Sequence, residues 1–161
     1  PGARWVEPES YHVTLRFLGD IDDDVARDVA AELDGIDRPA FDLVLDGLDA
    51  FGGRKPRAVF AAVAANPALT ELHAEHERLM RRVGLAPEGR KFSPHVTLAR
   101  LRAASPRQVA DYLALRGGFR AGPFRVERFV LMSSRASVGG GPYVVEADYP
   151  LASPATAGAA D

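Results

Sequence analysis

The chain contains the pattern Ser-x-His-Val-Thr-Leu twice, as SYHVTL (residues 10–15) and as SPHVTL (residues 93–98). In an extended strand, side chains two positions apart point to the same face. His12 is then on one face with Thr14, and His95 on one face with Thr97, while the neighbouring Val and Leu point the other way. If the two strands lie side by side, two imidazoles and two hydroxyls meet in one cleft.

This set of groups suits displacement at phosphorus. Histidine changes charge near neutral pH, so one ring can act as a base while the other acts as an acid. Threonine hydroxyls donate hydrogen bonds without carrying charge, which suits the non-bridging oxygens of a phosphate. In-line displacement needs a base behind the attacking water and an acid behind the leaving oxygen. The repeat therefore predicts acid–base chemistry by His12 and His95, without a metal or other cofactor.

Other uses of these residue types are less favoured. Two imidazoles alone make a poor zinc site, and neither motif carries an adjacent carboxylate. A second pair, His73 and His76, has helical i,i+3 spacing, but His76 falls on an apolar stripe and is interpreted as a core residue. Ser10 and Ser93 are two positions from their histidines with no orienting acid, which does not make a serine nucleophile.

Hydrophobic periodicity predicts the elements that position the motifs. Strands are expected at 10–18, 41–51, 57–64, 92–101, 124–134 and 143–151, and helices at 22–36, 66–84 and 105–117. Asn66 is a suitable N-cap and Gly84 a natural stop for the second helix. Ser105 and Gln108 predict a capping box at the start of the third.

The order of these elements favours an α+β fold. Each half of the chain opens with one motif, so a weak internal duplication is expected, with two lobes that each present one motif strand. We expect a single bilobal domain at 1–151 and a disordered tail at 152–161, which is rich in Ala, Gly, Pro and Ser. The segments GGRKP (52–56) and VGGGP (138–142) are expected to be hairpin loops.

Composition excludes several classes of protein. The chain has no cysteine, which excludes disulfides, thiolate metal sites and a cysteine nucleophile. There is no run of about 20 apolar residues and no leader-like segment, so we expect a cytoplasmic monomer without membrane association.

Charge is unevenly distributed although the net charge is only −2. Residues 20–50 carry a net −9, from eleven acidic residues against two arginines. Residues 78–107 carry a net +7, from eight basic residues against Glu88. This basic run either attracts an anionic substrate such as a phosphate ester or forms a solvated face.

The motifs and their flanks resemble those of the 2H phosphoesterases, a superfamily named for two His-x-Thr-x motifs. Within it, they are most similar to the RNA 2′,3′-cyclic phosphodiesterase family, also called 2′-5′ RNA ligase-like. The similarity lies in RWVEPESYHVTLRFLGDI, in KFSPHVTLARL and in the closing RFVLMSSRASVGGGPYVVEADYPL. Members usually begin with a further strand and helix ahead of the segment that corresponds to RWV, and these are missing from the sequence given.

The resemblance implies a bilobal fold with two antiparallel sheets flanking a central cleft and helices on the outside. It implies hydrolysis of an RNA-terminal 2′,3′-cyclic phosphate to a 2′-phosphomonoester. His95 would be the proton acceptor that activates water, and His12 the proton donor to the leaving 3′ oxygen. Substrate-binding roles would fall to Thr14, Thr97, Arg100 and Phe17. The threonines and Arg100 would hold phosphoryl oxygens, and Phe17 would either stack on the adjacent base or pack in the core.

The expected partners are RNA 3′ ends or nucleotides that bear a 2′,3′-cyclic phosphate. Two alternatives stay open. The first is a phosphodiesterase acting on another cyclic phosphate, derived from a nucleotide or from ADP-ribose, because only the pocket walls would differ. The second is a non-catalytic RNA- or nucleotide-binding module, although phosphate binding alone would favour Arg and Lys over two imidazoles.

Overall fold

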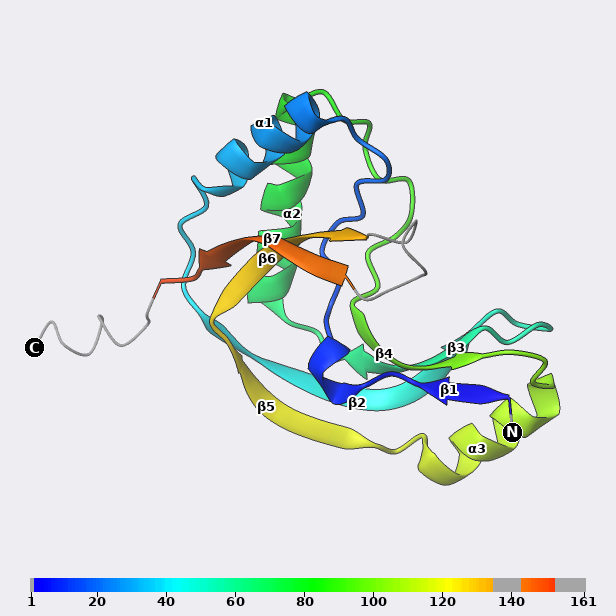
Figure 1. Ribbon diagram of the computed structural model, residues 1–161. Coiled ribbons are helices and arrows are strands. Elements are labelled where there is room, and N and C mark those ends of the chain that lie inside the picture. Colours follow the sequence, from blue (N-terminus) through cyan, green and yellow to red (C-terminus); the bar gives the residue numbers. More distant parts are fainter. Residues whose placement is uncertain (1, 135–142, 153–161) are drawn as a thin grey trace, which may run out of the picture. The chain divides into compact units, whose positions relative to one another are not determined.

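The structure is a computed structural model that describes residues 2–134 and 143–152 (Figure 1). The chain folds into two compact units, which are described separately. Unit 1 is formed by residues 2–14, 43–66 and 92–124, and unit 2 by residues 15–42, 67–91 and the described residues from 125 onward. Within the described part of the chain, no helix is both long and apolar enough to cross a bilayer.

A five-stranded sheet supplies the strands of unit 1. Its order is β1 (Ala3–Trp5), β4 (His95–Leu101), β3 (Ala58–Val63), β2 (Phe41–Phe51) and β5 (Arg120–Val126). The β1/β4, β4/β3 and β3/β2 pairs are antiparallel. The loop between β2 and β3 is the predicted hairpin loop at 52–56. Gly52 is required there because its φ is +110° and an added Cβ would lie 2.2 Å from the carbonyl oxygen of Lys55.

Helix α3 (Pro106–Arg116) packs on one face of this sheet (Figure 1). The predicted capping box begins it: Gln108 N–H donates to the Ser105 hydroxyl, and Ser105 N–H donates to the Gln108 side chain. The covered face includes Trp5 of β1, whose ring lies 6.2 Å from that of Tyr112. The opposite face of the sheet is the one that carries the motif side chains, as shown below.

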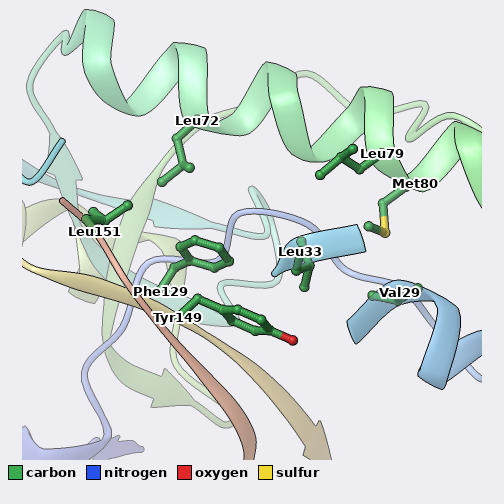
Figure 2. Packing of buried hydrophobic residues seen from close by; sticks show 8 residues of the cluster. All are labelled: Val29, Leu33, Leu72, Leu79, Met80, Phe129, Tyr149 and Leu151. Carbon is green, nitrogen blue, oxygen red and sulfur yellow. The ribbon is translucent and has the colours of Figure 1, made fainter. Parts of the chain in front are cut away.

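Unit 2 contains helices α1 (Asp23–Leu33) and α2 (Pro67–Arg82) and the antiparallel pair β6 (Arg128–Ser134) and β7 (Tyr143–Pro150). Asp22 caps α1 by accepting a hydrogen bond from Val25 N–H. Both helices turn apolar faces toward the strands (Figure 2). The resulting core is made of Val29, Leu33, Leu72, Leu79, Met80, Phe129, Tyr149 and Leu151.

Two predicted strands are wrong. Residues 10–18 do not form a strand: Pro8–Ser10 make a 3₁₀ turn, and only Val13 forms a β-bridge before the chain passes from unit 1 to unit 2. The single strand predicted at 124–134 is two strands, because β5 ends at Val126 in one sheet and β6 starts at Arg128 in the other. Alternation of side chains continues through such a change of sheet, so the sequence pattern does not reveal it.

The other predicted elements are confirmed within a few residues, and two features were missed. Strand β1 and the first residues of β5 were not predicted. The tail expected from 152 is wrong at its first residue, because Ala152 N–H donates to Arg38 O and Ala152 O accepts from Ala40 N–H. The loop expected at 138–142 and the rest of the tail lie outside the described residues.

His76 is a core residue, as its place on the apolar stripe predicts. It is 5% exposed, and its Nδ1–H donates to the carbonyl oxygen of Leu72 at 2.9 Å. Its ring packs edge-on against Phe129 at 4.8 Å. Burial lowers the pKa of His76, because a charged ring would lose its hydration there. Burial also lowers the pKa of His73.

This burial predicts a loss of stability in mild acid. The unfolded chain takes up the proton first as the pH falls, so stability is fully present above about pH 6.5, the ordinary pKa of histidine, and is lost below it. Urea unfolding at pH 7.5 and 5.5 should give a larger drop in midpoint for the wild type than for His76→Gln. Equal drops in the two proteins would contradict the assignment of this pH dependence to His76.

Candidate active site

The second motif lies on β4, a central strand of the unit 1 sheet. Val96 and Ala99 are buried on the face that α3 covers. His95 and Thr97 are half-buried and lie on the opposite face, as the alternation predicts. We call this side of the sheet the motif face.

The first motif lies beside the second, through an antiparallel bridge between Val13 and Val96. Residues around an antiparallel bridge face each other in reverse order. His12 is therefore across from Thr97, and Thr14 is across from His95. Val6 N–H donates to Leu98 O on the same edge of β4, which holds the incoming chain in this register. The prediction that each lobe presents one motif is wrong, since both His–Thr pairs belong to unit 1.

The two histidines are held by equivalent hydrogen bonds. His12 Nδ1 lies 2.9 Å from Ser10 O, and His95 Nδ1 lies 2.7 Å from Ser93 O. A carbonyl oxygen can only accept, so Nδ1 carries a proton in both rings. Nε2 is then the nitrogen that gains or loses a proton: it accepts in the neutral ring and donates in the charged one. The repeated serines thus contribute their carbonyl oxygens, not their hydroxyls.

Two aromatic side chains support His95 and were not predicted as site residues. Phe51 and Phe60 stack at 4.2 Å, and their rings lie 4.9 Å and 5.1 Å from the imidazole. Phe60 is across from Thr97 on β3, so it shares the motif face. Alternation along 57–64 gives the two faces of that strand, but only the register between strands shows that this ring meets His95.

Arg100 reaches the motif face through an irregularity in β4. An odd offset from His95 would put it on the other face of a regular strand. The pairing shifts, however: Phe60 is across from Thr97, Val59 from Ala99, and Ala58 from Arg100, which leaves Leu98 as an extra residue. Such a bulge resets the alternation. Arg100 is exposed and lies on one face with His95 and Thr97.

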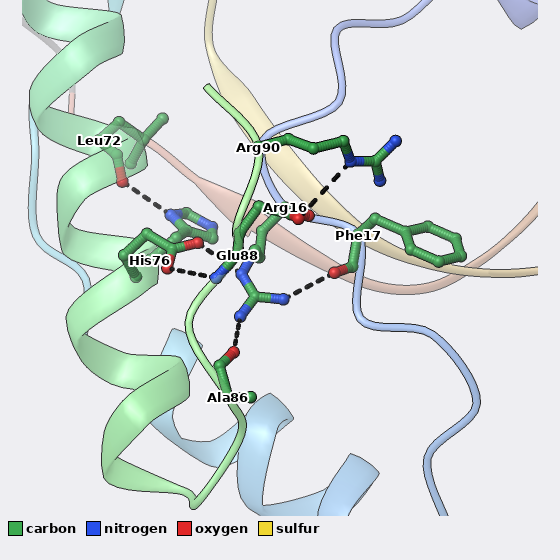
Figure 3. A network of polar contacts seen from close by, with 8 residues as sticks. Arg16, Phe17, Leu72, His76, Ala86, Glu88 and Arg90 are labelled. Atoms are coloured by element: carbon green, nitrogen blue, oxygen red, sulfur yellow. Dashed lines mark hydrogen bonds and ion pairs between the residues drawn. The ribbon is translucent and has the colours of Figure 1, made fainter. Parts of the chain in front are cut away.

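Phe17 belongs to unit 2 and is 60% exposed, so it does not pack in the core. The backbone beneath it is fixed by Arg16, whose side chain is 7% exposed (Figure 3). Arg16 donates to Glu77 at 2.5 Å through Nε, to Phe17 O at 2.7 Å and to Ala86 O at 2.5 Å. The buried guanidinium therefore ties residues 16 and 17 to α2 and to the loop that follows it.

The basic run at 78–107 is divided between the two units. In unit 2, Arg78, Arg82 and Arg90 form ion pairs with carboxylates, which compensate part of their charge. In unit 1, Arg100 is on the motif face. Among the described residues, no three His, Asp or Glu side chains are grouped closely enough to hold a metal ion.

A sequence model of the 2′-5′ RNA ligase superfamily matches residues 4–137, which include both motifs and β4, the strand that carries the second motif. The chain belongs to the 2′-5′ RNA ligase superfamily.

Two curated relatives illustrate the similarity. The RNA 2′,3′-cyclic phosphodiesterase of Aeropyrum pernix is 39% identical over 101 residues, which are 62% of this chain and 57% of that protein. The protein of the same name from Aquifex aeolicus is 32% identical over 155 residues, 92% of this chain and 82% of its own length.

Solved structures agree on the superfamily fold. The structure of TT0787 from Thermus thermophilus matches with a TM-score of 0.76 at 25% identity, over 95% of this chain and 84% of that one. LigT of Escherichia coli, solved with 3′-AMP, matches with a TM-score of 0.70 at 25% identity, over 93% and 82%. The expected α+β fold of the 2H phosphoesterases, with two sheets and helices, is confirmed.

Proposed function

We propose that this chain hydrolyses the 2′,3′-cyclic phosphate at an RNA 3′ end to a 2′-phosphomonoester, without a metal ion. Water attacks phosphorus and gives its proton to Nε2 of His95. The bond between phosphorus and the 3′ oxygen breaks, and Nε2 of His12 gives its proton to that oxygen. A bond is formed and a bond is broken at phosphorus, and one proton is gained and one lost by the histidine pair.

The observation that carries this proposal is the bridge between Val13 and Val96, which sets the two His–Thr pairs next to each other on one face. Its register crosses the pairs, with each threonine opposite the histidine of the other motif. The matched Nδ1 hydrogen bonds support the same proposal, because they make Nε2 the nitrogen that transfers the proton in both rings. The relatives named RNA 2′,3′-cyclic phosphodiesterase supply the substrate class.

The binding roles follow from side-chain chemistry. The hydroxyls of Thr14 and Thr97 donate to the non-bridging oxygens, where negative charge increases in the transition state. The guanidinium of Arg100 contributes positive charge on the same face. The ring of Phe17 is exposed, as the stacking role that the family resemblance implies for it requires.

The test is hydrolysis of a short RNA ending in a 2′,3′-cyclic phosphate, in excess EDTA and across pH 5 to 9. We expect turnover with a bell-shaped pH profile and a product that carries only a 2′-phosphate. Turnover that requires an added divalent cation would refute the metal-free mechanism. Binding of the RNA without turnover would favour the non-catalytic module, and faster turnover of an ADP-ribose cyclic phosphate would favour the other phosphodiesterase class.

A further inference from the structure

Two arginines are on neighbouring strands at one edge of the unit 1 sheet. Arg4 of β1 is directly opposite Arg100 of β4, and both are exposed. Like charges in this position oppose strand pairing. Among the described residues, no carboxylate forms an ion pair with either of them. By contrast, Arg120 of β5 is paired with Asp46 of β2 at 3.1 Å.

Both guanidiniums are on the motif face. The bulge at Leu98 puts Arg100 there, on one face with Thr97. Trp5 packs against Tyr112 of α3, so its neighbour Arg4 points to the opposite face of the sheet, which is the motif face. Two positive charges without a carboxylate partner among the described residues thus lie on the motif face, Arg100 near the end of β4 that is far from His95 and Arg4 across from it on β1.

The distance of Arg100 from the reacting centre is close to the distance between neighbouring phosphates in RNA. Arg100 is two ladder positions from Thr97, because Leu98 is the extra residue of the bulge. Two positions along a strand are about 7 Å. That is comparable with the separation of neighbouring phosphates in an extended single strand of RNA.

We infer that Arg4 and Arg100 form a second phosphate subsite, which binds the phosphodiester that links the terminal nucleotide to the one before it. This inference rests on the proposed function and names its substrate class: an oligonucleotide end, in preference to a free cyclic mononucleotide. An anion between the two guanidiniums removes their mutual repulsion and can accept paired hydrogen bonds from each.

The test compares the dinucleotide ApA ending in a 2′,3′-cyclic phosphate with 2′,3′-cyclic AMP. The measured quantity is the ratio of kcat/KM for the dinucleotide to kcat/KM for the mononucleotide. The wild type should favour the dinucleotide, and Arg4→Ala should lower the ratio about tenfold, as expected for the loss of a hydrogen-bonded charge. Arg4→Lys should recover part of it. The salt dependence of kcat/KM for the dinucleotide should also weaken by about one phosphate contact in Arg4→Ala.

Arg107→Ala is the matched control, since Arg107 is an exposed arginine on α3, which packs on the other face. Its ratio should equal that of the wild type. A ratio unchanged in Arg4→Ala, or lowered equally in Arg107→Ala, overturns the subsite.

A binding measurement separates this proposal from the proposed function. A fluorescein-labelled dinucleotide with a terminal 2′-phosphate should bind about tenfold more weakly to Arg4→Ala than to the wild type, by fluorescence polarisation. If the wild type turns over neither substrate, the proposed function fails, and this measurement still decides the subsite. Equal affinity of the two proteins rejects it.

Discussion

Replacing His95 by alanine is expected to lower kcat/KM for a 2′,3′-cyclic phosphate by about a thousandfold, and His12→Ala should have an effect of similar size. Each variant removes the proton acceptor or the proton donor on one side of phosphorus. Both imidazoles are fixed through Nδ1 to a backbone carbonyl, so each variant removes the Nε2 that this hydrogen bond orients. Steady-state kinetics in EDTA measures the effect.

His73→Gln is the control for this loss, because His73 lies on α2 in unit 2 and has no part in the proposed mechanism. Its kcat/KM should stay close to that of the wild type. Full activity in either His95→Ala or His12→Ala would contradict the two-histidine mechanism.

The second large effect is on stability and concerns the ion pair between Arg16 and Glu77. Their side chains are 7% and 15% exposed. Glu77→Ala leaves the Arg16 guanidinium buried without its carboxylate, which should lower the free energy of unfolding by about 3–5 kcal/mol. Urea unfolding at pH 7.5 measures the change.

The chain supplies a matched control for this effect. Arg27 pairs with Asp24, and these side chains are 72% and 85% exposed. Arg27→Ala should therefore cost at most about 1 kcal/mol. The double change Arg16→Met with Glu77→Leu should cost less than Glu77→Ala, because it leaves no unpaired buried charge. Equal losses of unfolding free energy in Glu77→Ala and Arg27→Ala would show that burial does not raise the contribution of the Arg16–Glu77 pair to stability.

Much of the site could be predicted from short-range sequence pattern. The repeat of His and Thr at spacing two, with Val between them, indicated that the four polar groups share one face and lie together. The bridge between Val13 and Val96 agrees with that expectation. The Ser105 capping box and the core position of His76 were equally predictable, because both depend on spacing within one element.

What could not be predicted depends on pairing between distant strands. Arg100 is at an odd offset from His95, which in a regular strand would place its side chain on the opposite face. Only the bulge at Leu98 brings it to the motif face. Phe51 and Phe60 meet His95 through the register of three strands. The first motif has strand-like alternation, but it pairs at Val13 alone, because the chain leaves the sheet edge directly afterwards.

The assignment of acid and base has one decisive test, which uses a substrate with sulfur in place of the leaving 3′ oxygen. A thiolate leaves without being protonated, so this substrate does not need the acid. In EDTA at pH 7, the loss caused by His12→Ala should shrink from about a thousandfold to less than about tenfold with the sulfur substrate. The loss caused by His95→Ala should remain, since water must still be deprotonated. Rescue of His95→Ala, or no rescue of His12→Ala, would contradict the proposed division of roles between the two histidines.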